Sequence, residues 1–210
     1  MKKCVLNPSL AQILRPAYDP CSSFAGTCLG MRWIPEAGHV PRGFRGAAGS
    51  LEEIELVLVY AEPGDPLPGE KHTGLESAYA FSVSTFESGA TQFHQNVKYI
   101  IEACWPGMPY SDQMKRVWMT ESVLCSAPKE SGGVRASVCH ECGTRYLLPQ
   151  LRLMPRALVV ALGSKARERL RRLGVKDFLE AGAVSPPGCN LPTARASWDR
   201  VVAEVKRRRA

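Results

Sequence analysis

Short apolar runs that alternate with segments of helical periodicity constrain the fold of this chain most. Residues 56–60, 117–120 and 157–162 are such runs, and each predicts a strand buried on both faces of a sheet. Residues 91–104 and 136–151 carry apolar side chains at helical spacing. This alternation predicts an α/β fold in three layers, with helices on both faces of a central, mainly parallel, four-stranded sheet.

The last part of the chain continues the alternation of strands and helices. Gly163 closes the third run, Ser164 is the expected cap of a helix, and Gly174 ends that helix. A short strand is expected at residues 183–184, before a last helix that begins near Thr193. Ligands of such sheets bind beyond the carboxyl ends of the strands, so the residues at those ends are the first functional candidates.

The length of 210 residues suits a single domain. Residues 1–50 are rich in Pro and Gly and predict an irregular N-terminal wrap around an α/β core of residues 51–210. Apolar runs stay well below the roughly 20 residues of a membrane span, and the start lacks an apolar signal core. We therefore expect a cytoplasmic, monomeric protein without a membrane partner.

The charge balance favours a polyanionic partner. There are 27 Lys and Arg residues against 20 Asp and Glu, which gives a net charge of +7. The excess is concentrated in residues 165–176 and 206–209. A solvated helix face and a set of phosphate contacts explain such runs equally well, and both interpretations stay open.

Three segments at expected strand ends carry a family resemblance. They are YAEPG at residues 60–64, MTESVLC at residues 119–125, and SPPGCNLP at residues 185–192. In this order they resemble the motifs of the uracil-DNA glycosylase superfamily, over roughly residues 55–200. The resemblance implies a hydrolase of base excision repair. It would bind DNA that contains a damaged base and cleave the N-glycosidic bond of uracil or another deaminated base, without a cofactor for the chemistry.

Glu62 is the first catalytic candidate implied by the resemblance. A carboxylate at this position orients water and stabilises the cationic sugar of the transition state. Ala61, Pro63 and Gly64 would complete this part of the substrate site, although Tyr60 stands where the family has glycine. The alternative interpretation of Glu62 is an exposed carboxylate in a turn after a strand.

Glu121 takes the position at which the family has an Asn that contacts the base edge. Asn both donates and accepts hydrogen bonds, whereas an ionised Glu only accepts. A buried Glu121 would either have a raised pKa and donate, or select a base that offers donors. A third interpretation is an exposed side chain, or one paired with a nearby Arg.

The proline-rich segment would supply further contacts. Ser185 takes the position of the family's His and is the second catalytic candidate, while Asn190 is expected to contact the substrate. The residues expected to contact the DNA backbone are Pro186, Pro187, Gly188, Gly163, Ser164 and Lys165.

Aromatic residues between the first two segments are candidates for stacking on an extruded base. Phe81 is preferred over Phe86, and both also suit a hydrophobic core. His94 could replace the missing imidazole, although its position suits a helix surface better.

The cysteines suggest a metal site. Cys125 and Cys142 resemble two ligands of the family's iron-sulfur branch, and Cys21 and Cys28 would complete a four-thiolate site for a 4Fe-4S cluster or zinc. Residues 139–142 also form a C-x-x-C step that suits either group. Otherwise these are small buried apolar side chains.

Two functions other than a glycosylase remain open. Without the family's His and Asn, the chain could be a non-catalytic protein that binds damaged DNA or abasic sites. Alternatively, the cysteines could organise a metal-stabilised interaction module.

Overall fold

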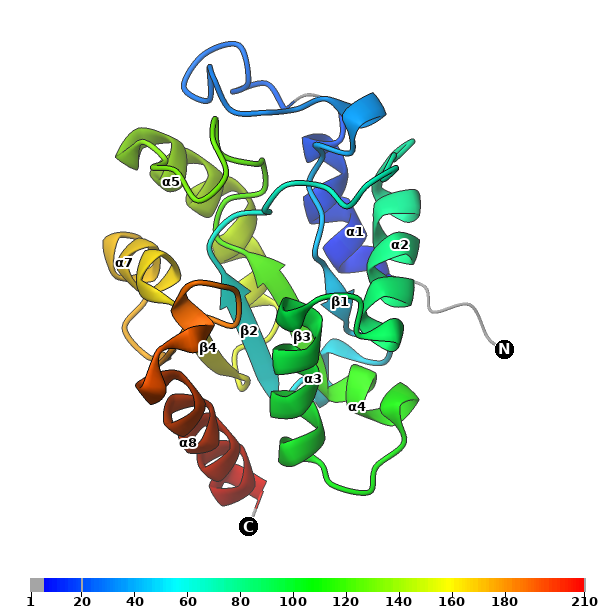
Figure 1. The fold of residues 1–210 in the computed structure, drawn as a ribbon, viewed down its shortest axis with the longest axis vertical. Helices are drawn as coiled ribbons and strands as arrows, with labels where there is room; N and C mark the ends of the chain where they lie inside the picture. Colours follow the sequence, from blue (N-terminus) through cyan, green and yellow to red (C-terminus); the bar gives the residue numbers. More distant parts are fainter. Residues whose placement is uncertain (1–5, 20, 210) are drawn as a thin grey trace.

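The computed structural model describes residues 6–19 and 21–209 and has an α/β fold with helices on both faces of one mixed sheet (Figure 1). The strands are β1 (Arg45–Gly46), β2 (Leu56–Tyr60), β3 (Val117–Glu121), β4 (Leu158–Leu162) and β5 (Leu179–Ala181). Their order is β1-β3-β2-β4-β5, and only β1 runs antiparallel to its neighbour. The α/β class is confirmed, with five strands where four were expected.

The helices follow the strands along the chain. They are α1 (Pro8–Leu14), α2 (Leu75–Ser88), α3 (Gln92–Cys104), α4 (Tyr110–Arg116), α5 (Ala136–Cys142), α6 (Leu148–Arg152), α7 (Ser164–Arg172) and α8 (Pro192–Arg209). A π-helical turn, Gly143–Leu147, joins α5 to α6. The three together form the helical segment predicted from residue 136 onward. In the described part of the chain, no helix is both long and apolar enough to cross a membrane.

Alternate side chains of the strands build two hydrophobic cores. Val57 and Val59 of β2 pack with α1, α2, α5, α6 and α7 on one face of the sheet. Leu56 and Leu58 pack with α3, α4 and α8 on the other face. Because β2 is buried on both faces, its sequence is a continuous apolar run rather than an alternating one.

Three expectations about local structure were wrong. The first 50 residues contain α1, whose Leu10 and Leu14 are buried, and strand β1. The last strand was expected at residues 183–184 but is Leu179–Ala181. It ends there because the backbone groups that follow form hydrogen bonds with side chains. The Gly182 N–H donates to Ser197 Oγ (2.7 Å), and the Val184 carbonyl accepts from Asn96 Nδ2 (2.9 Å).

The third error concerns the start of α7. Gly163, not Ser164, is its N-cap residue, and Gly163 has φ = +94°. This backbone conformation favours glycine, and a Cβ at residue 163 would also lie 3.1 Å from the Ala183 side chain. The close approach brings the end of β4 next to the segment that precedes the proline-rich loop.

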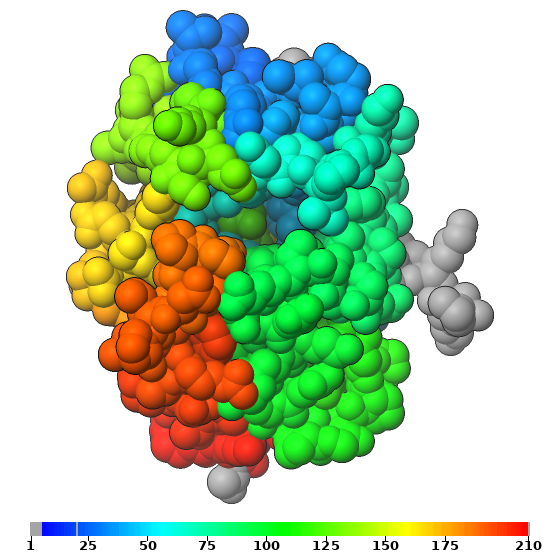
Figure 2. Space-filling view, viewed as in Figure 1, coloured from blue at the N-terminus to red at the C-terminus, as the bar shows by residue number. Residues whose placement is uncertain are grey.

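The carboxyl ends of β2, β3 and β4 lie at one edge of the sheet because these strands are parallel neighbours. Figure 2 shows a hollow in this face, between the segment after β2 (cyan), the loop before α8 (orange) and the start of α3 (green). We refer to it as the strand-end cleft.

Candidate functional site

The loop after β2 is held firmly through Glu62. Glu62 Oε1 accepts from Lys165 Nζ (2.5 Å), and Glu62 Oε2 lies 2.5 Å from an Arg169 guanidinium nitrogen. The side chains of Glu62 and Arg169 are each only 6% exposed. Glu62 is therefore a buried, doubly paired carboxylate, which excludes the interpretation as an exposed turn residue.

Neighbouring backbone groups fix the same loop. The Ala61 carbonyl accepts from the Arg169 guanidinium (2.6 Å) and from the Ser122 hydroxyl (2.7 Å). Arg42 donates to the Gly64 carbonyl, Pro63 is buried, and Gly64 is exposed. Because several separate segments hold this loop, its geometry is set before any ligand arrives.

Glu121, the last residue of β3, is 5% exposed and pairs in register with Tyr60 of β2. Burial, followed by the charge of Glu62, raises the pKa of Glu121 well above its usual value, while Arg42 and Arg169 oppose the shift. Among the described residues, Glu121 Oε2 and the Tyr60 hydroxyl are buried without a hydrogen-bond partner. The exposed interpretation of Glu121 was wrong, and the structure shows no ion pair between it and a described Arg.

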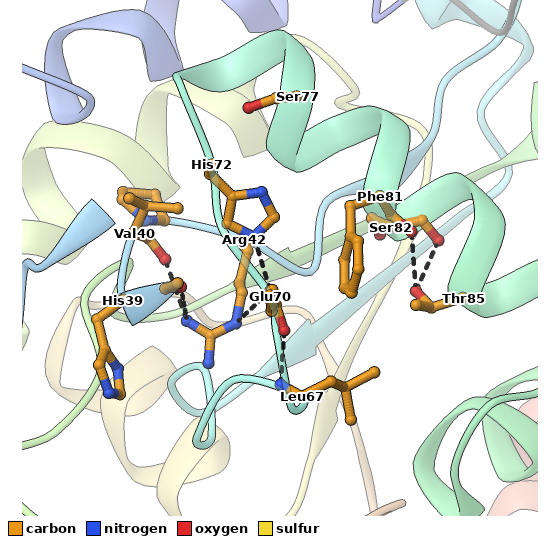
Figure 3. A network of polar contacts seen from close by, with 12 residues as sticks. His39, Val40, Arg42, Leu67, Glu70, His72, Ser77, Phe81, Ser82 and Thr85 are labelled. Atoms are coloured by element: carbon orange, nitrogen blue, oxygen red, sulfur yellow. Dashed lines mark hydrogen bonds and ion pairs between the residues drawn. The ribbon is translucent and has the colours of Figure 1, made fainter. Parts of the chain in front are cut away.

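A polar network surrounds Arg42, one of the charged groups that act on Glu121 (Figure 3). Glu70 is its centre: Glu70 Oε1 lies 2.7 Å from His72 Nε2 and 3.4 Å from Arg42 Nε, and its Oε2 accepts from the Leu67 N–H (2.7 Å). Burial raises the pKa of Glu70, but hydrogen bonds from His72 and Leu67 and the charge of Arg42 outweigh it, and the net pKa is lowered. Glu70 therefore serves as the anionic partner of Arg42.

Phe81 and Phe86 lie in different surroundings. Phe81 is half-buried, and its ring packs edge-on against His72, with ring centroids 5.3 Å apart. Phe86 is buried in the core and packs against His94, with centroids 4.6 Å apart. This arrangement leaves Phe81 as the better stacking candidate, as preferred from the sequence.

His94 lies near the start of α3 and is half-buried. Its Nδ1 is 2.8 Å from Thr91 Oγ1. Burial lowers the pKa of His94 to about 4, although the charge of Glu70 opposes this shift. The imidazole is therefore neutral at neutral pH, and its interaction with Glu70 indicates that it faces the same region.

The proline-rich loop is tied to α3. Gln92 Nε2 donates to Asn190 Oδ1 (3.2 Å), and the Cys189 N–H donates to the Ser185 carbonyl (3.0 Å). Ser185, Pro186, Pro187 and Asn190 are exposed, Gly188 is half-buried, and the Pro186-Pro187 peptide bond is cis. Leu191, which follows, is 61% exposed and was not singled out from the sequence.

The first residues of α7 lie beside the loop after β2. Ser164 is exposed and Gly163 half-buried, while Lys165 also donates to the Gly132 carbonyl (2.7 Å). Several later cations form ion pairs within the protein, which favours the solvated-face interpretation for them. These pairs are Arg167 and Arg171 with Glu180, Arg172 with Glu168, and Arg207 and Arg208 with Glu204.

The four predicted thiol ligands surround one small cavity. Cys21, Cys28, Cys125 and Cys142 line it, together with Glu141 and Tyr146. Burial and the neighbouring thiols raise the pKa of Cys28 to about 11 and that of Cys125 to about 12. The Leu124 N–H donates to Cys142 Sγ (3.3 Å).

The cysteines are not arranged around a single metal ion. Among the described residues, no group of three or more His, Cys, Asp or Glu side chains could hold one. Four thiolates are the usual ligands of an iron-sulfur cluster. Cys139 of the C-x-x-C step is not part of this cavity lining.

The structure thus brings Glu62, Lys165 and Glu121 together at the strand ends, and groups the four cysteines elsewhere. Four residues of this region were not predicted from the sequence to be parts of the site: Arg42, Glu70, His72 and Arg169. A signal existed for Arg169, which shares the buried face of α7 with Ala166 and Leu170 at helical spacing. No protein-family model matches this chain, and no curated protein matches it either.

Proposed function

We propose that this chain is a DNA glycosylase that hydrolyses the N-glycosidic bond of uracil or another deaminated base in DNA. One observation carries the proposal: two buried carboxyl side chains, Glu62 and Glu121, interact where the adjacent parallel strands β2 and β3 end. Buried, interacting carboxyl groups in a cleft are typical of catalytic sites. The motif resemblance described above supplies the reaction class.

The reaction needs an extruded nucleotide and one water molecule. The water oxygen forms a bond to the sugar C1′ while the C1′–N bond breaks, and the bonding electron pair leaves with the base. The water proton passes to a basic group or to the leaving base, which gives a free base and an abasic site. Glu62, held by Lys165 and Arg169, would stabilise the positive charge on the sugar and orient the water.

Two apolar side chains, Phe81 and Leu191, would contact the extruded base and the duplex. Phe81 offers a half-buried aromatic ring for stacking. Leu191 is an exposed apolar side chain at the end of the proline-rich loop, and proteins that kink DNA insert such side chains between base steps. Pro186, Pro187, Gly188 and Ser164 would contact the DNA backbone, and Asn190 the substrate.

The cysteine cavity would hold a 4Fe-4S cluster, bound by Cys21, Cys28, Cys125 and Cys142. The cluster would crosslink the N-terminal segment to β3 and α5, a structural contribution rather than a chemical step. Every cysteine among the described residues is a free thiol, which fits a reducing cytoplasmic compartment.

Single-turnover cleavage tests the proposal. Excess protein is mixed with duplexes that each contain one uracil, hypoxanthine or xanthine, and the released base is identified by mass. We expect release of at least one of these bases and a loss of about 100-fold or more in the rate of Glu62→Gln. Glu102→Gln, on the exposed surface of α3, is the matched control and should leave the rate unchanged. Equal rates in Glu62→Gln and the wild type would reject the role of Glu62.

A non-catalytic damage-binding protein is the second candidate. The double ion pair of Glu62 favours it, because both carboxylate oxygens already contact cations and neither is left free to orient a water molecule. This candidate predicts tight, salt-sensitive binding to damaged duplexes and no released base under excess protein.

A further inference from the structure

Arg42 joins its own N-terminal segment to the connection between β2 and α2 and to the loop after β3. Its side chain is 10% exposed, and its Nη2 donates to the Gly64 carbonyl. Its Nη1 donates to the Gly38 carbonyl (3.1 Å) and to Ser126 Oγ (3.4 Å). Its Nε lies 3.4 Å from Glu70 Oε1, and Figure 3 shows the guanidinium between this carboxylate and the N-terminal segment.

The shape of the guanidinium makes these contacts possible at the same time. A guanidinium has five N–H donors in a rigid, planar fork, whereas the ammonium of Lys has all its donors on one nitrogen. Nε of Arg42 contacts Glu70 while Nη2 reaches the Gly64 carbonyl. A lysine at residue 42 has a single nitrogen and cannot occupy both positions.

The Gly64 carbonyl accepts from two side chains. Besides Arg42, the Ser126 hydroxyl donates to it (3.3 Å). Gly64 lies two residues after Glu62, whose carboxylate pairs with Arg169 of α7. The loop that carries Glu62 is therefore held by α7 on one side and by the N-terminal segment and the loop after β3 on the other.

The N-terminal segment itself packs tightly against the connection between β2 and α2. Gly38 has φ = +76°, and a Cβ at this position would lie 2.7 Å from the Glu70 carbonyl oxygen and 2.8 Å from the Pro66 Cβ. Contacts this short leave no room for a side chain, and the positive φ also favours glycine. The backbone that carries Arg42 is thus seated on the connection that Arg42 holds.

Glu70 is the anionic partner that a buried guanidinium requires. Its side chain is 3% exposed, and its Oε2 accepts from the Leu67 N–H (2.7 Å). Removing the positive charge at residue 42 would take away the cation of a buried carboxylate and destabilise the protein. A charge-conserving change to Lys keeps a cation beside Glu70 but removes the fork, which separates a role in folding from a role in positioning.

Building on the proposed glycosylase function, we infer that Arg42 is a positioning residue for the reaction. It acts through the Gly64 carbonyl rather than on the substrate, and it fixes the loop that places Glu62 beside the sugar of the extruded nucleotide. A displacement of about 1 Å at a reacting group can slow a reaction about 100-fold, so a shifted loop should slow the chemical step and leave DNA binding unchanged. The N-terminal segment is then a functional part of the site.

Arg42→Lys tests this inference by single-turnover cleavage of a duplex that the wild type cleaves. At saturating protein, we expect release of the base to be about 10- to 100-fold slower than in the wild type. The dissociation constant for a duplex with a 2′-fluoro analogue, whose fluorine slows cleavage, should stay within about twofold of the wild type. Arg116→Lys is the matched control, because Arg116 pairs with Glu55 at the amino ends of the strands, and it should cleave at the wild-type rate.

Ser126→Ala is a second variant, which leaves Arg42 in place. It removes one of the two donors to the Gly64 carbonyl and only one atom from a buried side chain. We expect a loss of about two- to tenfold in the rate, as for one hydrogen bond. In the double variant with Arg42→Lys, the total loss should be smaller than the product of the two single losses, because both residues act on one carbonyl.

Hydrogen exchange tests the position of the loop without DNA. In Arg42→Lys, the amides of residues 64–72 should exchange at least about tenfold faster than in the wild type, because one ammonium nitrogen cannot hold both Gly64 and Glu70. The amides of β4 should exchange as in the wild type. Arg116→Lys should match the wild type in both segments.

The outcomes separate the inference from the proposed function. A wild-type rate in Arg42→Lys, a loss confined to the dissociation constant, losses that multiply in the double variant, or unchanged exchange at residues 64–72 overturns the inference. No base released by the wild type from any duplex rejects the proposed function, and hydrogen exchange then still shows whether Arg42 holds the loop. If Arg42→Lys does not fold, an unchanged rate and unchanged exchange in Ser126→Ala overturn the inference.

Discussion

Arg169 and Glu62 form an ion pair that is buried on both sides, with 2.5 Å between the guanidinium and the carboxylate. The pair joins α7 to the loop after β2, and Arg169 also donates to Ser122 Oγ (3.1 Å) and to the Ala61 carbonyl. The contribution of this pair to stability can be tested by mutation.

Replacing Arg169 by Met should lower the free energy of unfolding by about 3 kcal/mol, because it leaves a buried carboxylate without one of its two cations. Arg172→Met is the matched control. Arg172 lies on the same helix in an exposed pair with Glu168, and its loss should cost less than about 0.5 kcal/mol. Urea titrations of both variants measure the difference. Equal costs would show that the buried pair has no special role.

Replacing Leu191 by Ala should weaken binding to a damaged duplex while leaving the free energy of unfolding within about 0.5 kcal/mol of the wild type. The side chain is exposed in the free protein, so its removal leaves no cavity. Leu29→Ala removes an equally exposed leucine, at 68% exposure, on the N-terminal segment and serves as the control. If both variants bind DNA equally well, Leu191 does not enter the duplex.

Anaerobic incubation with iron and sulfide should give a brown protein with about four irons per chain. Cys142→Ala should abolish iron uptake, because it removes one of four thiols around the cavity. Cys104→Ala, which changes a buried thiol in the other hydrophobic core, should bind iron as the wild type does. Iron and sulfide analysis distinguishes the variants. Uptake by Cys142→Ala would exclude the proposed ligand set.

His94 should make the protein less stable in acid. Its pKa is about 4 in the folded protein because of burial, against about 6.5 in an unfolded chain. The unfolded state therefore binds the proton more tightly, and stability is lost as the pH falls from about 6.5 towards 4. In His94→Gln, denaturant titrations between pH 7 and pH 5 should show a smaller loss than in the wild type. His140→Gln, an exposed position, should behave as the wild type.

The strands β2, β3 and β4 were predictable to within about a residue, because burial on both faces makes a continuous apolar run. Strand β1 was not, because it has only two residues and exists through its pairing with β3. Helix α2 was missed because it is rich in Ser and Thr and begins after Gly74, which supplies no capping side chain.

The site residues at the ends of strands could be predicted from the sequence. The residues that reach the site only through tertiary contacts could not. Glu62 and Glu121 stood out because each directly follows or ends an apolar run. Arg42 and Glu70 lie in segments rich in Pro and Gly, and their pairing joins two parts of the chain that no local pattern connects. The ion pairs of Glu62 could not be predicted from the sequence either, because Arg169 lies about a hundred residues later in the chain.

The short antiparallel strand β1 covers part of the outer edge of β3. Without it, β3 would be an edge strand, with a row of unsatisfied backbone groups on one of the most apolar segments of the chain. Such edges pair readily with other chains and lead to aggregation. The two residues of β1 therefore occupy backbone groups of β3 at Trp118 and Met119 that another chain could otherwise pair with.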